Sequence, residues 1–381
     1  MAAGRVLQYQ VEAYYTGIVI RWTRRTILKT GSAALAGLLP GRAATIRLPP
    51  RVLVGLIGLE GHFGEVLDAA KILPQIQVTA VAAATPRELQ RMGSNVMIAK
   101  ARRYDDYRRM LDAEKLDVVC ICNQNGQRAR AVLACVERGL AVAAEKPLAI
   151  TLEDLDAVRR AVARRQTPLT MLLPMRFAPE YQAMRAIVGS GEIGEPIALG
   201  AQKSYKLGLA RGQRPDWMRK RSSFGGTIPF IGIHMVDLMR FISGREFVET
   251  AAFHSNVAFP ELGEMENNTA VIYRLDNQGT ASLRMDYLRP EAAPTHGDDR
   301  LRIAGAKGIV EYQAGTLTLI TAAKAPHAVE ALPPASLLFA DFLDSIYNGK
   351  KHGLPLEDIY RVTEIVLKSR QAAETNRVVK L

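Results

Sequence analysis

The feature that most constrains the fold is an apolar run that ends in a glycine-rich turn. The run covers residues 52–57, and Gly58, Gly61 and Gly64 follow it at intervals of three. A strand that leads through such a turn into a helix points backbone N–H groups at a phosphate. The pattern therefore predicts the first unit of a nucleotide-binding α/β domain. The predicted cofactor-binding residues of this turn are Gly58, Gly61, His62, Phe63 and Gly64.

Strands and helices continue to alternate as far as residue 173. Apolar strands are predicted at 52–57, 78–82, 117–122, 140–144 and 169–173, and amphipathic helices at 64–72, 104–111, 129–138 and 152–164. Strands that are apolar throughout and separated by helices are typical of a parallel sheet covered on both faces. We therefore predict an α/β fold that begins with a doubly wound Rossmann domain over residues 51–173.

The pattern changes after residue 173. Strands of alternating polarity are predicted at 197–205, 250–257, 268–275, 280–287, 300–304, 308–312 and 316–320, and helices at 179–190 and 233–242. Turns rich in Gly separate these strands, which favours antiparallel pairing. We predict an α+β domain over residues 174–335 with an open, mostly antiparallel sheet. Helices at 336–348 and 356–374 are predicted to pack back on the body as a C-terminal segment, 336–381.

A second motif, Glu145-Lys146-Pro147, follows the predicted strand at 140–144. A Lys at the end of this strand can reach the nicotinamide end of a bound dinucleotide. Hydride leaves an alcohol carbon only as the hydroxyl proton is removed, and a His is suited to take that proton. The Lys146 cation can stabilise the developing alkoxide. Proton-accepting and charged groups from separate domains commonly meet in a cleft, so we expect the base to come from the second domain.

Four stretches, in this order, resemble the glucose-fructose oxidoreductase / inositol dehydrogenase family (Gfo/Idh/MocA). The first is the glycine-rich turn, and the second is the segment 117–125 with Glu145-Lys146-Pro147 after its helix. The third leads from Phe224-Gly225-Gly226-Thr227 into His234-Met235-Val236-Asp237, and the last is the closing helix from Pro355 onward. The resemblance extends over about residues 51–381.

This resemblance implies a nucleotide-binding domain and a second domain whose open sheet makes the contacts of a homo-oligomer. It implies oxidation or reduction of carbohydrates and similar polyols with NAD or NADP. Some members instead use a bound cofactor in transient redox steps that lead to elimination or hydrolysis. The resemblance also assigns a hydrogen bond with the reacting hydroxyl to Lys146 and the acid/base role to His234.

Two departures from the family pattern concern the cofactor. Glu60 stands where a second Gly would let the backbone approach the pyrophosphate, and its charge would repel phosphates that it faced. Gly61 can take the place of that Gly if the turn contains a one-residue bulge. The acid expected after the second strand is replaced by Ala83. Thr85 and Arg87 could receive a 2′-phosphate as cofactor-binding residues, which favours NADP over NAD.

Other departures lie on the substrate side. Phe230 occupies the place of an Asp that helps to bind the reacting hydroxyl, and Arg128 occupies that of a His. Arg176 follows a strand end, where cofactor contacts are expected, and Trp217 could stack on a sugar face. The remaining predicted site residues are Asn123, Asn125, Arg128, Glu145, Lys146 and Arg176 for the cofactor, and Lys146, Tyr205, Trp217, His234, Asp237, Tyr287 and His296 for the substrate.

A basic segment with an apolar sequel lies at the N-terminus. Arg24-Arg25 precedes the apolar stretch 31–39 and the small residues 41–44, a pattern typical of a twin-arginine signal. We predict a signal segment over 1–44, passage through the twin-arginine translocase, and a location in the periplasm or outside the cell. Because that route moves folded proteins, the cofactor could be tightly bound before export. A basic tail on a cytoplasmic protein is the alternative, and the true start codon stays open.

Composition argues against two classes of site. Residues 1–50 contain seven Arg or Lys and one acidic residue, and so provide half of the net charge of +12. The remaining positive charge is scattered among acidic residues, which is typical of a solvated surface and argues against nucleic-acid binding. Cys120, Cys122 and Cys135 have no second Cys pair or nearby His, so we expect neither a metal site nor a disulfide framework.

The leading hypothesis is an exported NAD(P)-dependent oxidoreductase that acts on a sugar or sugar derivative, with Lys146 and His234 at the reacting hydroxyl. A second hypothesis is a glycoside-cleaving enzyme that uses tightly bound NAD transiently. A third is a nucleotide- or sugar-binding protein without turnover, which Phe230 and Glu60 favour. The identity of the sugar, the choice between NAD and NADP, and the oligomer size do not follow from the sequence.

Overall fold

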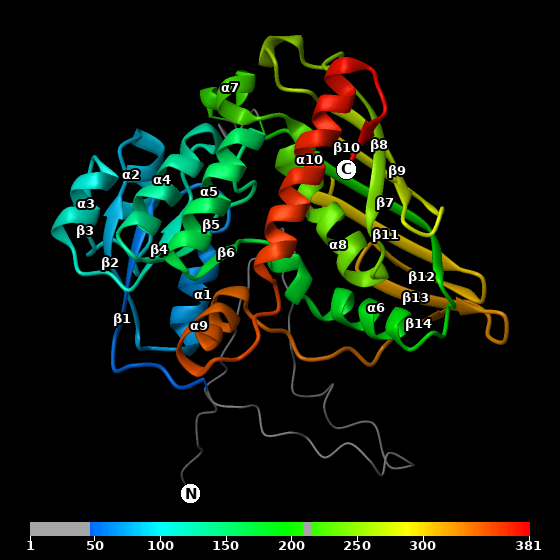
Figure 1. Ribbon diagram of the computed structural model, residues 1–381, viewed down its shortest axis with the longest axis horizontal. Helices are drawn as coiled ribbons and strands as arrows, with labels where there is room; N and C mark the ends of the chain where they lie inside the picture. Colours follow the sequence, from blue (N-terminus) through cyan, green and yellow to red (C-terminus); the bar gives the residue numbers. More distant parts are fainter. Residues whose placement is uncertain (1–45, 209–214) are drawn as a thin grey trace, which may run out of the picture.

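The computed structural model describes residues 46–208 and 215–381, and the predicted signal segment 1–44 lies outside the described residues. Two sheets stand side by side, and helix α10 (Leu356–Thr375) runs between them (Figure 1). Within these residues no helix is long and apolar enough to cross a membrane. The chain thus builds its two sheets in succession and then returns to the space between them.

The first sheet has six strands in the described part of the chain, and all of them are parallel. Their order is β3 (Arg102–Tyr104), β2 (Ile76–Ala82), β1 (Val52–Ile57), β4 (Val118–Ile121), β5 (Ala141–Ala144) and β6 (Leu169–Met171). The helices between them are α1 (Gly64–Ile72), α2 (Pro86–Ser94), α3 (Tyr107–Ala113), α4 (Asn125–Glu137) and α5 (Leu152–Arg165). The strands β4, β5 and β6 are buried along their whole length. The predicted doubly wound Rossmann sheet is confirmed.

Two elements of the first half of the chain, the strand β3 and the helix α2, were not predicted. The helix predicted at 104–111 begins at Tyr107, because residues 102–104 pair with β2 and Asp106 caps the helix. Helix α2 begins after Thr85, whose hydroxyl accepts the backbone N–H of Glu88 in a capping box. The capping residues decide both helix starts.

The strand order places a crevice at the carboxyl ends of β1 and β4. From β1 the chain builds β2 and β3 on one side and then returns to add β4 on the other. In open parallel sheets, ligands bind at such a point, because the loops on the two sides lead in opposite directions. The glycine-rich turn after β1 lies at this crevice.

The second sheet has nine strands in the described residues, with β7 near its centre. Their order is β14 (His327–Ala328), β13 (Thr316–Thr321), β12 (Gly308–Gln313), β11 (Gly297–Gly305), β7 (Pro196–Lys206), β10 (Thr280–Arg289), β9 (Asn268–Leu275), β8 (Phe247–Ser255) and β15 (Val379–Lys380). Neighbouring strands are antiparallel except β7 and β10, which are parallel. The chain between those two passes through helices, β8 and β9 instead of a hairpin, which permits the parallel pair. The predicted open, mostly antiparallel sheet is confirmed.

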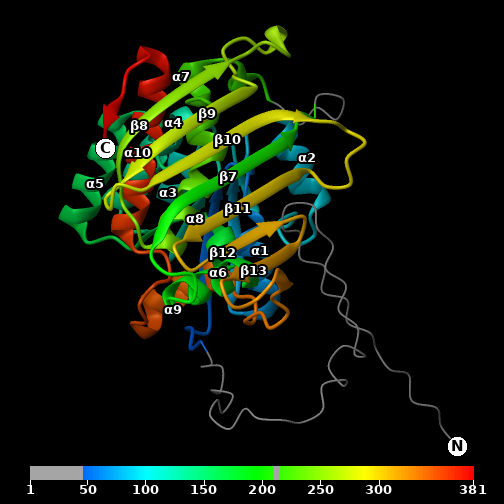
Figure 2. The same cartoon turned by 90° about the vertical axis from the view of Figure 1, so that its right-hand side faces the viewer.

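One face of this second sheet is covered and the other is open. Helices α6 (Pro179–Gly189), α8 (Ile233–Ser243) and α10 lie on the covered face, and Figure 2 shows the opposite face with no described helix in front of it. Residues of β9 alternate between buried and exposed, as expected for such a sheet. On the open face, Ile272 and Phe253 are 59% and 71% exposed.

The last two helices connect the two sheets. Helix α9 (Leu338–Asn348) packs against α1, while α10 packs against α5 and β6 on one side and against β8 and α8 on the other. The other helical elements of the described residues are the short turns Pro174–Phe177, Asp216–Arg219, Arg221–Phe224 (α7), Ile228–Gly232 and Pro260–Leu262. Of these, Ile228–Gly232 is one turn of π-helix that runs directly into α8.

A buried carboxylate fixes the segment that enters this π-turn. Glu266 contacts the guanidinium of Arg221, accepts the backbone N–H of Thr227 at 2.9 Å, and lies 3.0 Å from Nδ1 of His254. Burial would raise the pKa of Glu266, but the contact with His254 and the Arg221 charge lower it from 4.5 to about 2. The folded state therefore stabilises the ionised form of Glu266.

We predict that Glu266→Gln lowers the free energy of unfolding by roughly 3 kcal/mol at pH 7, the equivalent of that pKa change. A depressed carboxyl pKa contributes stability above pH 4.5, and this contribution is lost as the pH falls toward 2. The difference between wild type and variant should therefore shrink below pH 4.5. Urea unfolding at a series of pH values measures this, and equal stabilities at pH 7 would refute it.

Candidate active site

A cleft of about 840 Å³ lies between loops of the first sheet and residues of the second half of the chain. Its size falls within the range of roughly 300–1,000 Å³ that is usual for ligand sites. It brings together most of the site residues predicted from the sequence. Those that line it are Gly61, His62, Phe63, Gly64, Arg87, Asn125, Arg128, Glu145, Lys146, Tyr205, Trp217, His234 and His296.

The glycine-rich turn forms one wall of the cleft in a backbone conformation that requires Gly. Gly58 and Gly61 have φ of +73° and +62°. A Cβ on Gly61 would lie 2.5 Å from the carboxyl carbon of Glu145. At Gly64, where α1 begins, a Cβ would meet no atom within 4 Å. The turn thus packs closely against Glu145 at Gly61 but leaves open space at the start of α1, which can admit a phosphate.

Glu60, which was expected to repel phosphates, is paired with two cations. Its carboxylate lies 3.3 Å from Nε of Arg87 and 3.0 Å from Nη1 of Arg91, both on α2. Arg91 also donates to the carbonyl of Leu59. The charge of Glu60 is therefore compensated within the wall of the cleft.

Glu145, after β5, is held by His62 from the turn. Nδ1 of His62 lies 2.9 Å from Oε2 of Glu145, and the backbone N–H of His62 donates to the same oxygen at 3.2 Å. Burial would raise the pKa of Glu145, but the charge and hydrogen bond of His62, then the charge of Lys146, lower it. Glu145 therefore stays ionised and ties the turn to the loop after β5.

Lys146 is buried and points at Phe230 in the π-turn. Its Nζ donates to the carbonyl of Phe230 at 2.7 Å and lies 3.7 Å from the centroid of the Phe230 ring. An ammonium at this distance from a ring face is attracted by the π electrons. Phe230, where the resemblance leads one to expect an Asp, therefore holds the Lys146 ammonium with an aromatic face and a backbone carbonyl.

His234 stands in the first turn of α8 and faces the same space. Its ring is edge-on to that of His62, with centroids 5.4 Å apart, and among the described residues its Nδ1 has no hydrogen-bond partner. Burial, followed by the positive charges of Lys146 and Lys203, lowers the pKa of His234 well below 6.5. A neutral imidazole beside an ammonium can accept a proton, which is the arrangement required of a base.

Arg128, predicted as a cofactor ligand, is buried at the inner side of the cleft. Its guanidinium donates to the carbonyl of Pro147 at 2.8 Å and to that of Asn123 at 2.5 Å. Arg128 thus joins the loops after β4 and β5 and fixes the position of Lys146. Asn125 donates to the carbonyl of Phe224 at 2.8 Å, and its own Oδ1 is buried with no partner among the described residues.

Six predicted residues do not line the cleft as the described residues define it. They are Gly58, Thr85, Asn123, Arg176, Asp237 and Tyr287. Arg176 and Asp237 pair with each other in a buried contact, and Arg176 also donates to Asp358 of α10 at 2.8 Å. These contacts direct Arg176 and Asp237 toward each other and Arg176 also to α10, and their predicted binding roles stay predictions. Tyr287 is buried in the sheet, 6.4 Å from Tyr205 between ring centroids.

Residues missed from the sequence complete the cleft. Arg91 is the clearest case, and its position four residues after Arg87 on a helix was the available signal.

Aromatic rings of Tyr205, Trp217 and His296, which were predicted, also line the cleft, and those of Tyr205 and His296 lie 4.7 Å apart. These rings offer apolar faces to a ligand.

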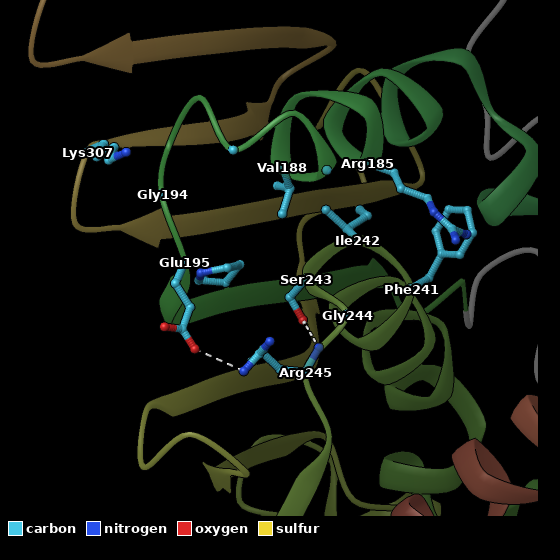
Figure 3. Close-up of a pocket in the computed structure, with 13 residues that line it drawn as sticks. Arg185, Val188, Gly194, Glu195, Phe241, Ile242, Ser243, Gly244, Arg245 and Lys307 are labelled. Atoms are coloured by element: carbon cyan, nitrogen blue, oxygen red, sulfur yellow. Dashed lines mark hydrogen bonds and ion pairs between the residues drawn. The ribbon is translucent and has the colours of Figure 1, made fainter.

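A second hollow of about 520 Å³ lies at the C-terminal ends of α6 and α8 (Figure 3). Arg245 binds Glu195 there at 3.0 Å, and the guanidinium of Arg185 lies 4.0 Å from the ring centroid of Phe241. Because His234 is the second residue of α8, the far end of the helix at Ser243 is about 13 to 14 Å away from it. This hollow is therefore separate from the Lys146 and His234 pair.

Comparison with known proteins matches both halves of the chain to one family. Residues 52–172 match an oxidoreductase family with an NAD-binding Rossmann fold, and residues 181–311 match the GFO/IDH/MocA C-terminal domain. A Thermotoga maritima structure assigned as an oxidoreductase is 34% identical, with a TM-score of 0.81, over 87% of this chain and 100% of that one.

Named dehydrogenases are also similar. Myo-inositol 2-dehydrogenase of Thermotoga maritima is 25% identical over 67% of this chain and 73% of its own length. D-apiose dehydrogenase of Paraburkholderia graminis is 25% identical over 81% of each chain.

We predict that Lys146 and Phe230 are coupled energetically. Phe230→Leu keeps the backbone carbonyl but removes the aromatic face, and should lower the free energy of unfolding by about 2 kcal/mol, the usual value for a desolvated contact of this kind. In a Lys146→Met background the same substitution should cost about 1 kcal/mol less. Chemical unfolding of the four proteins measures this coupling, and additive costs would contradict the contact.

Proposed function

We propose that this chain, which belongs to the Gfo/Idh/MocA family of NAD(P)-dependent oxidoreductases, oxidises a hydroxyl-bearing carbon of a sugar or sugar derivative. The observation that carries the proposal is the meeting of Lys146 and His234 beside the glycine-rich turn, in one cleft of about 840 Å³. The similarity to inositol and apiose dehydrogenases supports a polyol or sugar as the substrate.

The residues of the cleft fit a nicotinamide dinucleotide. The turn at Gly58 and Gly61 has the positive φ that close backbone approach requires, and the start of α1 is open at Gly64. The negative charge of Glu60 is compensated by ion pairs with Arg87 and Arg91. The residues that would hold the dinucleotide are Gly61, His62, Phe63, Gly64, Arg87 and Asn125. When bound, the nicotinamide supplies the hydride acceptor for the alcohol carbon.

The proton is handled by two side chains of this protein. His234 is neutral before the reaction, because burial and nearby cations disfavour its charged form. An imidazole nitrogen of His234 then accepts the hydroxyl proton. Nζ of Lys146 donates a hydrogen bond to the oxygen as negative charge develops on it. Phe230 and Arg128 do not react in this scheme, but they fix where Lys146 lies.

Glu60 and Phe230, the two departures that favoured a protein without turnover, are both compatible with an active enzyme. The charge of Glu60 is compensated by two arginines, and Phe230 positions Lys146 through its carbonyl and ring. Tyr205 and Trp217 supply apolar rings in the same cleft, which suit the apolar faces of a sugar.

The proposal extends to assembly and location. The exposed Phe253 and Ile272 on the uncovered sheet face support a homo-oligomer formed through that face. The twin-arginine pattern around Arg24-Arg25 supports export through the translocase to the periplasm, with a cytoplasmic protein as the alternative. An exported enzyme would carry its NAD or NADP with it, which requires tight binding.

To test the function, nucleotide released from the purified protein is identified by mass, and the protein is then incubated with a panel of sugars, polyols and aryl glycosides. Reduced nicotinamide that appears with a sugar is the expected result. Release of aglycone without net reduction would favour the glycoside-cleaving alternative. Absence of both nucleotide and turnover would contradict the proposed function.

On a sugar that is turned over, we predict that His234→Ala lowers kcat/KM by about 10²–10⁴-fold, the usual contribution of an acid/base group. His327→Ala is the matched control, because His327 is exposed on β14 and does not line the cleft. Initial rates of NAD(P)H formation measure the effect. Activity of His234→Ala within twofold of the control would remove His234 from the acid/base role.

We also predict that the acidic limb of the pH profile lies below pH 6.5, because the pKa of His234 is lowered in the folded protein. His234 therefore stays neutral as the pH falls through 6.5, and kcat/KM for oxidation should decline only below that pH, where His234 becomes protonated. The profile of kcat/KM between pH 5 and 9 tests this. A decline centred at or above pH 6.5 would contradict it.

A further inference from the structure

Three charged side chains form a cluster beside the end of β2. Glu60 from the glycine-rich turn is 17% exposed and contacts Arg87 and Arg91 of α2 at 3.3 and 3.0 Å. All three residues line the cleft. A ligand in the cleft can therefore touch this cluster, although the carboxylate already has two cationic partners.

The place that an acid takes in many dinucleotide folds holds none here. Strand β2 ends at Ala82, and Ala83 after it is buried. In such folds an acid at this place accepts the 2′-hydroxyl of the adenosine ribose. Glu88, the acid that follows on α2, accepts the backbone N–H groups of Thr85, Ala84 and Leu59 at 3.0, 3.2 and 3.4 Å. Glu88 is thus committed to the backbone, whereas Glu60 lines the cleft together with Arg87 and Arg91.

The pairing of Glu60 changes what the two arginines can recognise. A 2′-phosphate would compete with the Glu60 carboxylate for Arg87 and Arg91. A phosphate close enough to contact these arginines would also be repelled by the negative charge of Glu60. A 2′-hydroxyl, in contrast, can donate to Glu60 while both ion pairs remain. The same cluster therefore favours a hydroxyl over a phosphate.

We propose that Glu60, held by Arg87 and Arg91, selects NAD over NADP by accepting the 2′-hydroxyl and by excluding a 2′-phosphate from the two guanidinium groups. This proposal rests on the nicotinamide cofactor of the proposed function. It reverses the preference for NADP that Arg87 and Thr85 suggest in the sequence, because Arg87 is paired with Glu60 and Thr85 caps α2.

The test is a pair of equilibrium titrations with NADH and NADPH, followed by nicotinamide fluorescence, on protein freed of co-purified nucleotide. Wild type should bind NADH at least tenfold more tightly than NADPH. Glu60→Gln keeps the side-chain shape but removes the charge that occupies the arginines. In this variant NADPH binding should tighten at least tenfold, while NADH binding weakens by a few fold at most.

Asp68→Asn is the matched control, because Asp68 also lines the cleft and pairs with a cation, Lys71, at 2.6 Å. It removes the same charge from α1 and should leave the ratio of NADH to NADPH affinity unchanged. Equal movement of the ratio in both variants would indicate a general charge effect and overturn the proposal.

Wild type alone also provides a test if Glu60→Gln does not fold. Tighter binding of NADPH than of NADH to wild type would overturn the role of Glu60 but leave the oxidoreductase function intact. Binding of neither nucleotide would contradict the proposed function itself.

Discussion

The contact between Lys146 and Phe230 joins the two sides of the cleft. Lys146 follows β5 of the first sheet, whereas Phe230 belongs to the π-turn before α8, and the 2.7 Å hydrogen bond and the ring contact bring both to one point. Each side of the contact is held separately. Arg128 binds the carbonyl after Lys146, and Glu266 binds Thr227 at the entry to the π-turn. The position of His234 relative to Lys146 depends on this contact, because His234 is four residues after Phe230.

Charge compensation determines what the cleft can do. Glu145 is ionised because His62 and Lys146 offset its burial, while the Lys146 cation lowers the pKa of buried His234. Glu145 is thereby kept anionic and His234 neutral in the same cleft, so that a proton acceptor, His234, and a hydrogen-bond donor, Lys146, line one space. Glu60 follows the same rule at the other end of the cleft, where two arginines compensate its charge. Electrostatic pairing thus makes an atypical turn compatible with a dinucleotide.

The sequence predicts the elements better than it predicts the contacts. Apolar strands and the turn from Gly58 to Gly64 were sufficient for the first sheet, and alternating polarity for the second, since local patterning decides these features. Lys146 and His234, which the family resemblance pointed out, line one cleft, and their catalytic roles stay predictions. The parallel pairing of β7 with β10 could not be predicted, because it depends on the path of the chain between them. Nor could the pairing of Arg176 with Asp237 and Asp358, because a buried ion pair between distant segments has no local sequence signal.

A crystal structure with a nicotinamide nucleotide bound tests the central claim most directly. We expect the phosphates to lie at the glycine-rich turn and the start of α1, and the nicotinamide ring to lie in the cleft beside Nζ of Lys146 and the imidazole of His234. A nucleotide bound elsewhere, or a nicotinamide ring out of reach of those two groups, would contradict this claim.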